Sequence, residues 1–169
     1  AANGPKGLAI VRELGDGVMC VNQPQPGFSW CSLLVLGTVL DDGEEASSER
    51  ALAAAGPGLT VAYHGTYEVA GAAAVDGLPG GAEWRAHIDA IPEHERHLAL
   101  HELHLVGISE RDRPLLNGEM LKAFTWTGSA ADIRDRLANA RDAGATEIMY
   151  APMGPDVARE LETFKRATS

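Results

Sequence analysis

The sequence predicts an α/β fold with parallel strands and a long helical connection, formed as a single domain over residues 1–169. Three observations predict this class. A loop, a helix and a short apolar strand follow one another within residues 1–21, an order typical of half a parallel α/β unit. A nearly continuous apolar run from Trp30 to Leu40 is typical of a strand buried on both faces of a parallel sheet. A helix–strand–helix pattern closes the chain after residue 128.

The first predicted helix follows the loop Ala1-Ala2-Asn3-Gly4-Pro5. Pro5 suits the first helical turn, where no backbone N–H is needed, and Leu8 and Leu14 lie on one apolar face before Gly15 ends the helix. Free N–H groups at a helix N-terminus, together with the helix dipole, favour an anion. The loop therefore predicts either a phosphate site or an ordinary turn without a ligand.

The next elements are a short strand at Val18 to Val21 and, after the apolar run, a helix from Glu45 to Ala55. Ser47 or Ser48 is expected to cap this helix, and the Gly56-Pro57-Gly58 segment is expected to break it. Residues 59–119 then alternate short helices with loops. A connection of this length inside a compact domain is usually functional, often as a lid or a substrate wall.

The last unit begins at Gly128-Ser129, after a short strand or loop over residues 124–127. Ser129 is the predicted N-cap of a helix from Ala130 to Ala143, with Asp132 completing a capping box. Because barrel enzymes often bind phosphate near their last strands, Gly128-Ser129 is a second candidate anion site. The cap explains these residues without a ligand, so this site ranks below the N-terminal loop.

Two segments resemble one protein family, namely residues 1–21 and the stretch from Gly128 to Asp156. Both are similar to luciferase-like monooxygenases, especially the branch that uses the deazaflavin coenzyme F-420. The resemblance implies that Asn3, Gly4 and Pro5 hold the phosphate tail of the cofactor, that Ala1 and Ala2 pack near it, and that Cys20 and Val21 contact its ring. It also implies hydride transfer or monooxygenation of a small organic substrate, with coenzyme F-420 or, alternatively, FMN.

Chain length refines the expected fold. A complete (β/α)8 barrel usually needs roughly 250 residues, and this chain has 169. It starts at the loop that follows the fifth barrel strand in the family, so we expect the C-terminal half of a TIM barrel of the bacterial luciferase type. The expected partner is the missing N-terminal half-barrel or a second copy. The alternative is a non-catalytic half-barrel that serves in assembly. No catalytic residue is predicted, because the acid or base in this family commonly lies in the first half.

Histidines are concentrated in the long connection, at positions 94, 97, 101 and 104. On one continuous helix they would form a stripe, which is compatible with a metal site, a polar surface or a pocket wall. The His101-Glu102-Leu103-His104 segment is one residue short of the HExxH spacing, so no metal is expected. His101 and His104, with His64 elsewhere in the connection, are the candidate substrate-pocket residues.

Composition limits the possible partners and location. The formal charge of −10 argues against nucleic acid, which requires basic surfaces. No apolar run approaches the roughly 20 residues needed to span a bilayer, so no membrane partner is expected and the predicted location is cytoplasmic. Cys20 and Cys31 form no CxxC pair and are expected to be reduced, buried thiols.

Overall fold

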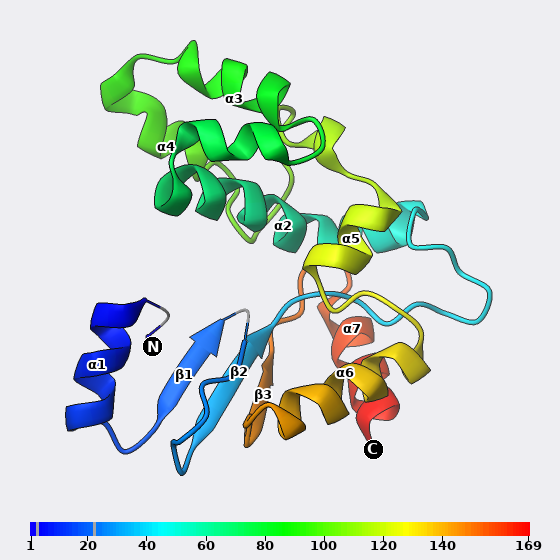
Figure 1. Ribbon diagram of the computed structural model, residues 1–169. Helices are drawn as coiled ribbons and strands as arrows, with labels where there is room; N and C mark the ends of the chain where they lie inside the picture. Colours follow the sequence, from blue (N-terminus) through cyan, green and yellow to red (C-terminus); the bar gives the residue numbers. More distant parts are fainter. Residues whose placement is uncertain (3, 22) are drawn as a thin grey trace.

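The computed structural model describes residues 1–2, 4–21 and 23–169, which form two layers (Figure 1). The lower layer holds a parallel sheet with helices packed against it, and the upper layer is helical. Short 3-10 or π-helical turns occupy Thr66–Ala70, Ala72–Gly77, Glu93–Glu95 and Arg113–Leu115. The longer elements are, in chain order, α1 (Pro5–Leu14), β1 (Val18–Val21), β2 (Cys31–Val35), α2 (Glu49–Gly65), α3 (Gly81–Asp89), α4 (Arg96–Leu100), α5 (Gly118–Phe124), α6 (Ala130–Asp142), β3 (Glu147–Tyr150) and α7 (Val157–Thr168).

Within the described residues the sheet has the order β1-β2-β3, and both pairs of strands are parallel. One face buries Cys20, Leu33 and their neighbours under side chains of α1, α6 and α7. On the opposite face Met149 is 40% exposed and Val21 is half-buried. Since side chains alternate along a strand, the helices cover one face of this sheet and leave the other more open.

The predicted α/β class with parallel strands is confirmed by this sheet and its helices. The predicted helical connection is also observed, because α2 to α5 and their linking turns form the upper layer (Figure 1). Three parallel strands are common to many α/β folds and do not by themselves establish half of a (β/α)8 barrel. The half-barrel therefore stays a prediction.

The predicted break of the second helix at Gly56-Pro57-Gly58 is wrong, because α2 runs without interruption from Glu49 to Gly65. Tertiary packing explains the difference. A Cβ on Gly56 would lie 2.9 Å from a side-chain atom of Ile108, and one on Gly58 would lie 2.8 Å from Met153. The two glycines thus let neighbouring segments approach this buried stretch closely. We infer that this packing offsets the roughly 3 kcal/mol that a proline costs inside a helix.

The apolar run from residue 30 to residue 40 is only partly a strand, since β2 ends at Val35. Beyond it Gly37 has a φ of +150° and approaches the backbone of Trp126 so closely that a Cβ would lie 2.4 Å away. Val39 then forms an isolated parallel bridge with Gly128. The second half of the run therefore leaves β3 and pairs with the segment that leads into α6.

The helix caps follow the sequence closely. Ser48 caps α2 by accepting a hydrogen bond from the N–H of Ala51, and Pro5 begins α1. The capping box of α6 is complete, because the Ser129 side chain accepts from the N–H of Asp132 while the Asp132 carboxylate accepts from the N–H of Ser129. In the part of the chain that the structure describes, no helix is both long and apolar enough to cross a membrane.

Candidate functional site

The N-terminal loop lies against the sheet. The N–H of Ala2 donates to the carbonyl of Met19 in β1 at 3.1 Å, and the Ala2 side chain is buried. Gly4 is the N-cap of α1 and has open space around it, since an added Cβ would meet nothing within 4 Å. Asn3, the remaining predicted phosphate ligand of this loop, lies outside the described residues.

The first turn of α1 has no side-chain cap and no acidic residue, and it contains Lys6. Four other helices are capped by side chains, which belong to Ser48, Asn117, Ser129 and Asp156. The N–H groups at the start of an α-helix have no partner within the helix. Among the described residues, no side-chain oxygen caps the start of α1 in competition with an anion.

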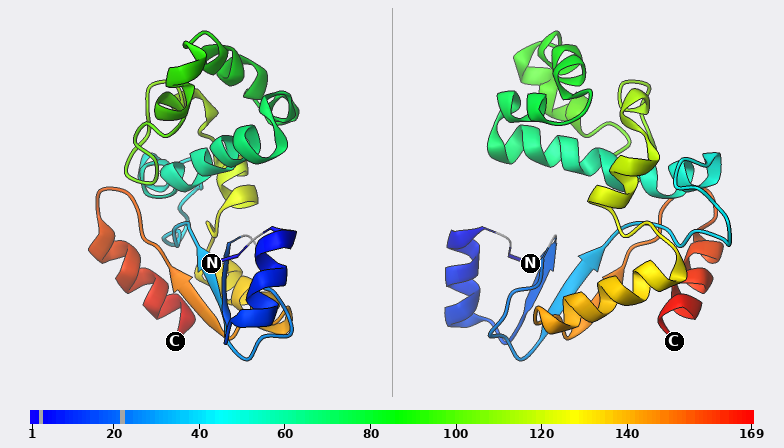
Figure 2. Two further views of the ribbon diagram at one scale, coloured as in Figure 1. Left: turned by 90° about the vertical axis from the view of Figure 1, so that its left-hand side faces the viewer. Right: turned by 45° about the vertical axis from the view of Figure 1, so that its right-hand side comes forward.

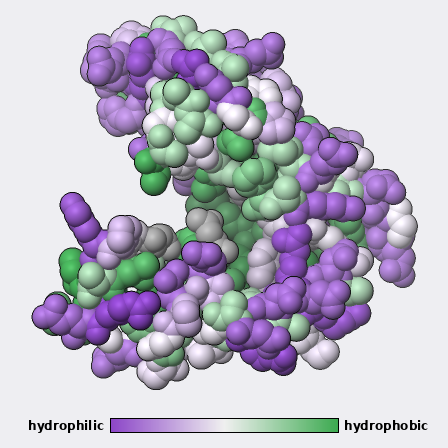
Figure 3. Space-filling view, viewed as in Figure 1, coloured by the Kyte–Doolittle hydropathy of each residue, from purple (hydrophilic) through white to green (hydrophobic). Residues whose placement is uncertain are grey.

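This helix start lies at the same edge of the sheet as the carboxyl end of β1, and the edge faces the helical layer (Figures 1 and 2). Figure 3 shows a hollow that opens at the left between the two layers, with hydrophobic surface on its inner side. Ligands of barrel enzymes bind at the carboxyl ends of the strands. The start of α1 at Gly4 and Pro5 thus lies at the carboxyl edge of the sheet.

The structure corrects the expected ring contact of Cys20. Its side chain is fully buried on the helix-covered face, where its Sγ lies 3.6 Å from Sγ of Cys31. Burial, assisted by the neighbouring Cys31 thiol, raises the pKa of Cys20 to about 11. Of the two predicted ring contacts, only Val21 lies on the more open face of the sheet. Both cysteines are free and buried, as expected.

The second candidate anion site at Gly128-Ser129 is filled by the protein's own carboxylate. One carboxylate oxygen of Asp132 accepts hydrogen bonds from both the N–H and the hydroxyl of Ser129, each at 2.8 Å. These hydrogen bonds hold the pKa of Asp132 below its usual range. The capping box therefore explains this segment without a ligand.

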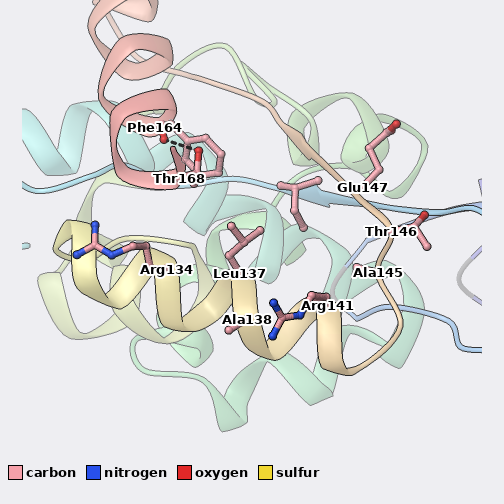
Figure 4. A pocket seen from close by; sticks show the side chains of 10 residues that line it. Arg134, Leu137, Ala138, Arg141, Ala145, Thr146, Glu147, Phe164 and Thr168 are labelled. Carbon is pink, nitrogen blue, oxygen red and sulfur yellow. Dashed lines mark hydrogen bonds between the residues drawn. The ribbon is translucent and has the colours of Figure 1, made fainter.

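A groove of about 620 Å³ lies between α6, α7 and the start of β3 (Figure 4). Arg134 and Arg141 project from α6 along it, and Leu137 and Phe164 contribute apolar surface. Its strand residues are those at the amino end of β3, which is the edge opposite to the carboxyl ends of the strands. The groove is therefore not the expected cofactor site.

The predicted histidine stripe is not formed, because α4 ends at Leu100 and turns follow it. His94 and His97 are exposed and lie apart from the other two. His101 and His104 instead meet His64, near the end of α2 and 40 residues before His104. The structure thus brings together the three predicted pocket residues and separates them from the rest of the stripe.

The three rings face one another through their Nδ1 atoms. His104 Nδ1 lies 3.3 Å from His64 Nδ1 and 3.3 Å from His101 Nδ1. Each residue offers one ligand atom, and the three atoms all lie within 4.8 Å of one another. His64 is 1% exposed and His101 is partly open to solvent. This group is called the histidine cluster below.

Carboxylates lie behind two of the rings. His101 Nε2 is 2.8 Å from Glu68 Oε1, and His64 Nε2 is 3.4 Å from Asp112 Oδ2. The latter contact is at ion-pair distance but lacks hydrogen-bond geometry, so within the described chain the His64 nitrogen is a buried polar atom without a hydrogen bond. Carboxylates therefore lie beside the outward Nε2 atoms of two rings whose Nδ1 atoms face His104.

Asp112 is a rigid support for His64. It is 1% exposed and accepts hydrogen bonds from Trp84 Nε1 at 2.7 Å and from Ser109 Oγ at 2.8 Å. Burial raises the pKa of Asp112, but the nearby His64 and the hydrogen bonds from Trp84 and Ser109 outweigh burial and lower it. Asp112 is thus held as a carboxylate. The Trp84 ring also stacks on His64, with ring centroids 5.8 Å apart.

The sequence patterns do not indicate Asp112 or Glu68, and they do not join His64 to the other two histidines. No spacing signal connects these residues, because they lie 33 to 48 positions apart from their partners. Burial of His104, together with the charges of His64 and His101, lowers its pKa and favours its neutral form. A neutral imidazole presents a lone pair, which is the form that binds a metal.

Comparison with protein-family models and with curated proteins finds no match to this chain.

Proposed function

We propose that this chain is the C-terminal half of a TIM barrel of the luciferase-like type, within an oxidoreductase that uses coenzyme F-420 or FMN. The proposal rests on the resemblance of residues 1–21 and of the C-terminal segment to that family. The observation that carries it is the start of α1 at the carboxyl edge of the sheet, where no side chain of the described residues caps the helix. A phosphate group at that position would receive backbone N–H groups and the positive end of the helix dipole.

The residues present fit the phosphate tail of such a cofactor. The open space at Gly4 lets a phosphate approach the backbone, Pro5 fixes the first turn, and Lys6 adds a positive charge nearby. Ala2 anchors the loop to β1 through its N–H. Val21 contributes apolar surface at the sheet edge toward which a ring would extend. The bound ring would supply the hydride chemistry, and these residues bind and orient it.

The open face of the sheet supports the barrel part of the proposal. In a barrel the helices cover the outer face of the strands, and the inner face packs against the remaining strands. Here Met149 on the less covered face is 40% exposed, and Val69, Leu98 and Val106 in the upper layer are 89%, 69% and 81% exposed. Exposed apolar surface and open sheet edges favour association.

The assembly is tested by analytical ultracentrifugation of the purified chain at micromolar concentration. We expect a dimer, or a complex with a separate N-terminal half-barrel. A monodisperse monomer would contradict the half-barrel part of the proposal.

Cofactor binding is tested by titrating the assembled protein separately with coenzyme F-420 and with FMN, followed by absorbance and fluorescence. Gly4→Val is the informative variant, because its backbone is extended at φ −97° and ψ 160° and tolerates a β-branched side chain. We expect it to weaken binding by about tenfold, the equivalent of losing one favourable helix-terminus interaction.

Gly77→Val is the matched control, because Gly77 also has no atom within 4 Å of an added Cβ and belongs to the upper layer. We expect Gly77→Val to bind like the parent. Equal affinity of Gly4→Val and the parent would refute the phosphate loop. Absence of binding by the parent to either cofactor would favour a non-catalytic assembly protein.

A further inference from the structure

We propose that His64, His101 and His104 form a binding site for a divalent transition-metal ion, of which Zn²⁺ is the best fit, with Asp112 and Glu68 as supporting carboxylates. This inference is independent of the proposed cofactor site, and it replaces the expectation of no metal. That expectation rested on the spacing of the histidines within one segment and on the lack of a cysteine or second cluster that would complete a ligand shell. The structure adds His64, which comes from a different helix.

The distances match those of a tetrahedral site. With Zn–N bonds of about 2.0–2.1 Å, two nitrogens on a tetrahedral zinc ion lie about 3.3 Å apart. The two contacts of His104 Nδ1, with His64 and with His101, are both 3.3 Å. The third pair, His64 with His101, also lies within 4.8 Å, so all three ligand atoms surround one point.

The protons of the cluster leave a place for a cation. Glu68 Oε1 lies 2.8 Å from His101 Nε2 and Asp112 Oδ2 lies 3.4 Å from His64 Nε2, so a proton on each of these outer nitrogens faces a carboxylate and leaves a lone pair at Nδ1 toward His104. His104 Nδ1 carries at most one proton, so it can donate a hydrogen bond to either His64 or His101 but not to both. The other contact is then between two lone pairs. One metal ion at the centre satisfies all three nitrogens at once.

The outer carboxylates are those that a metal-bound histidine needs. A ligating imidazole usually donates its second N–H to a carboxylate or carbonyl, which fixes the ring and increases its basicity. Glu68 and Asp112 hold this position for two of the three rings, and Asp112 is itself fixed by Trp84 and Ser109. Histidines that only form a polar surface do not need carboxylates fixed beside their second nitrogen atoms.

The backbone on both sides of His104 adopts the left-handed conformation. Leu103 and Leu105, the residues on either side, have φ angles of +56° and +61°. Non-glycine residues rarely adopt this left-handed conformation, and such outliers cluster at functional sites. The turn places His104 within reach of His64 and His101 while exposing Leu103 and Leu105, which are 49% and 38% exposed.

The donor set identifies the class of metal. Imidazole nitrogens suit zinc, copper, iron and nickel, whereas calcium and magnesium prefer oxygen ligands. Three histidines leave one position of a tetrahedral ion open, and His101 at 40% exposure lies toward solvent. The site therefore resembles open zinc sites more than closed structural sites with four protein ligands.

The experiment measures bound metal, so its result does not depend on whether the chain binds a cofactor. The purified chain is stripped with a chelator, dialysed against Zn²⁺ or Co²⁺ and analysed for metal content, and the Co²⁺ form is examined for the visible absorption of a tetrahedral ion. We expect about one equivalent per chain. A parent that retains less than about a tenth of an equivalent would overturn the proposal.

Variants of the chain show which residues bind the metal. His101→Ala with His104→Ala should abolish binding, whereas His94→Ala with His97→Ala, two exposed histidines of the same segment, should leave it unchanged. Asp112→Asn should weaken binding by about 10- to 100-fold. His101→Ala alone, at a partly exposed position, should also lower affinity while circular dichroism shows a folded chain. Equal metal binding by the His101 variant and the parent would refute the assignment.

Discussion

Replacing Glu160 by glutamine should destabilise the chain strongly, because this carboxylate joins three parts of the structure. Glu160 is 2% exposed and lies in the first turn of α7. It accepts hydrogen bonds from Arg50 at 3.0 Å, Arg159 at 2.9 Å and Thr38 at 2.6 Å. Through these contacts α7 is tied to α2 and to the segment that follows β2.

The magnitude follows from the charge left behind. Removing one member of a buried ion pair costs about 3–5 kcal/mol, because its partner remains buried without compensation. Arg50 and Arg159 are 29% and 19% exposed, so water stabilises them in part and the lower end of this range applies. We expect Glu160→Gln to lose about 3 kcal/mol of unfolding free energy, which corresponds to a fall in Tm of about 6–12 °C for a domain of this size.

The assay is urea unfolding followed by far-ultraviolet circular dichroism, with thermal unfolding as a second measurement. Glu162→Gln is the matched control, because Glu162 is exposed on the same helix. This control should change stability by less than about 0.5 kcal/mol. If the two variants unfold at the same urea concentration, the buried network contributes nothing measurable and the reasoning fails.

Three further predictions concern pH, thiol reactivity and packing. Burial raises the pKa of Glu44, but hydrogen bonds led by that of Arg50 outweigh burial and lower the pKa from 4.5 to about 2. The contribution of Glu44 to stability should therefore be present above pH 4.5 and be lost as pH falls toward 2. In an acid titration, a Glu44→Gln variant should lose less stability over that pH range than the parent. Cys20, whose pKa is raised to about 11 by burial, should react with a thiol reagent at pH 8 only as fast as the chain opens, and rapid reaction without denaturant would contradict its burial. Gly81→Ala would place a Cβ 1.8 Å from the backbone oxygen of Val75 and should lower the free energy of unfolding in urea by about 1–3 kcal/mol or more. Gly77→Ala, whose Cβ would meet no neighbour, should leave this free energy nearly unchanged.

Local patterns in the sequence predicted most of the lower layer. Pro5 at the start of α1, the short strand from Val18 to Val21 and the capping box of Ser129 with Asp132 were all found in the structure. Each of these depends on residues within about four positions of one another, whose backbone and side-chain preferences act before any tertiary contact forms. The same short range makes the N-terminal loop recognisable as a candidate anion site.

The upper layer was decided by tertiary packing. Local rules end a helix at Gly56-Pro57-Gly58, yet the close approach of neighbouring segments to the two glycines keeps α2 continuous to Gly65. That continuation carries His64 to the far end of the helix. A helix ending at residue 55 would have left this histidine in a loop, without a defined position relative to His104.

The sequence by itself determined the α/β class, the helix starts at Pro5 and after Ser129, and the residue types available for chemistry. Only the tertiary structure decided which of those residues meet. His64 lies 40 positions from His104, and Asp112 lies 48 positions from His64, so no periodicity connects them. Their convergence depends on how α2 packs with the turns after α4, and on the left-handed backbone at Leu103 and Leu105. Side-chain clusters of this kind arise from long-range burial, whereas helix and strand patterns arise from near neighbours.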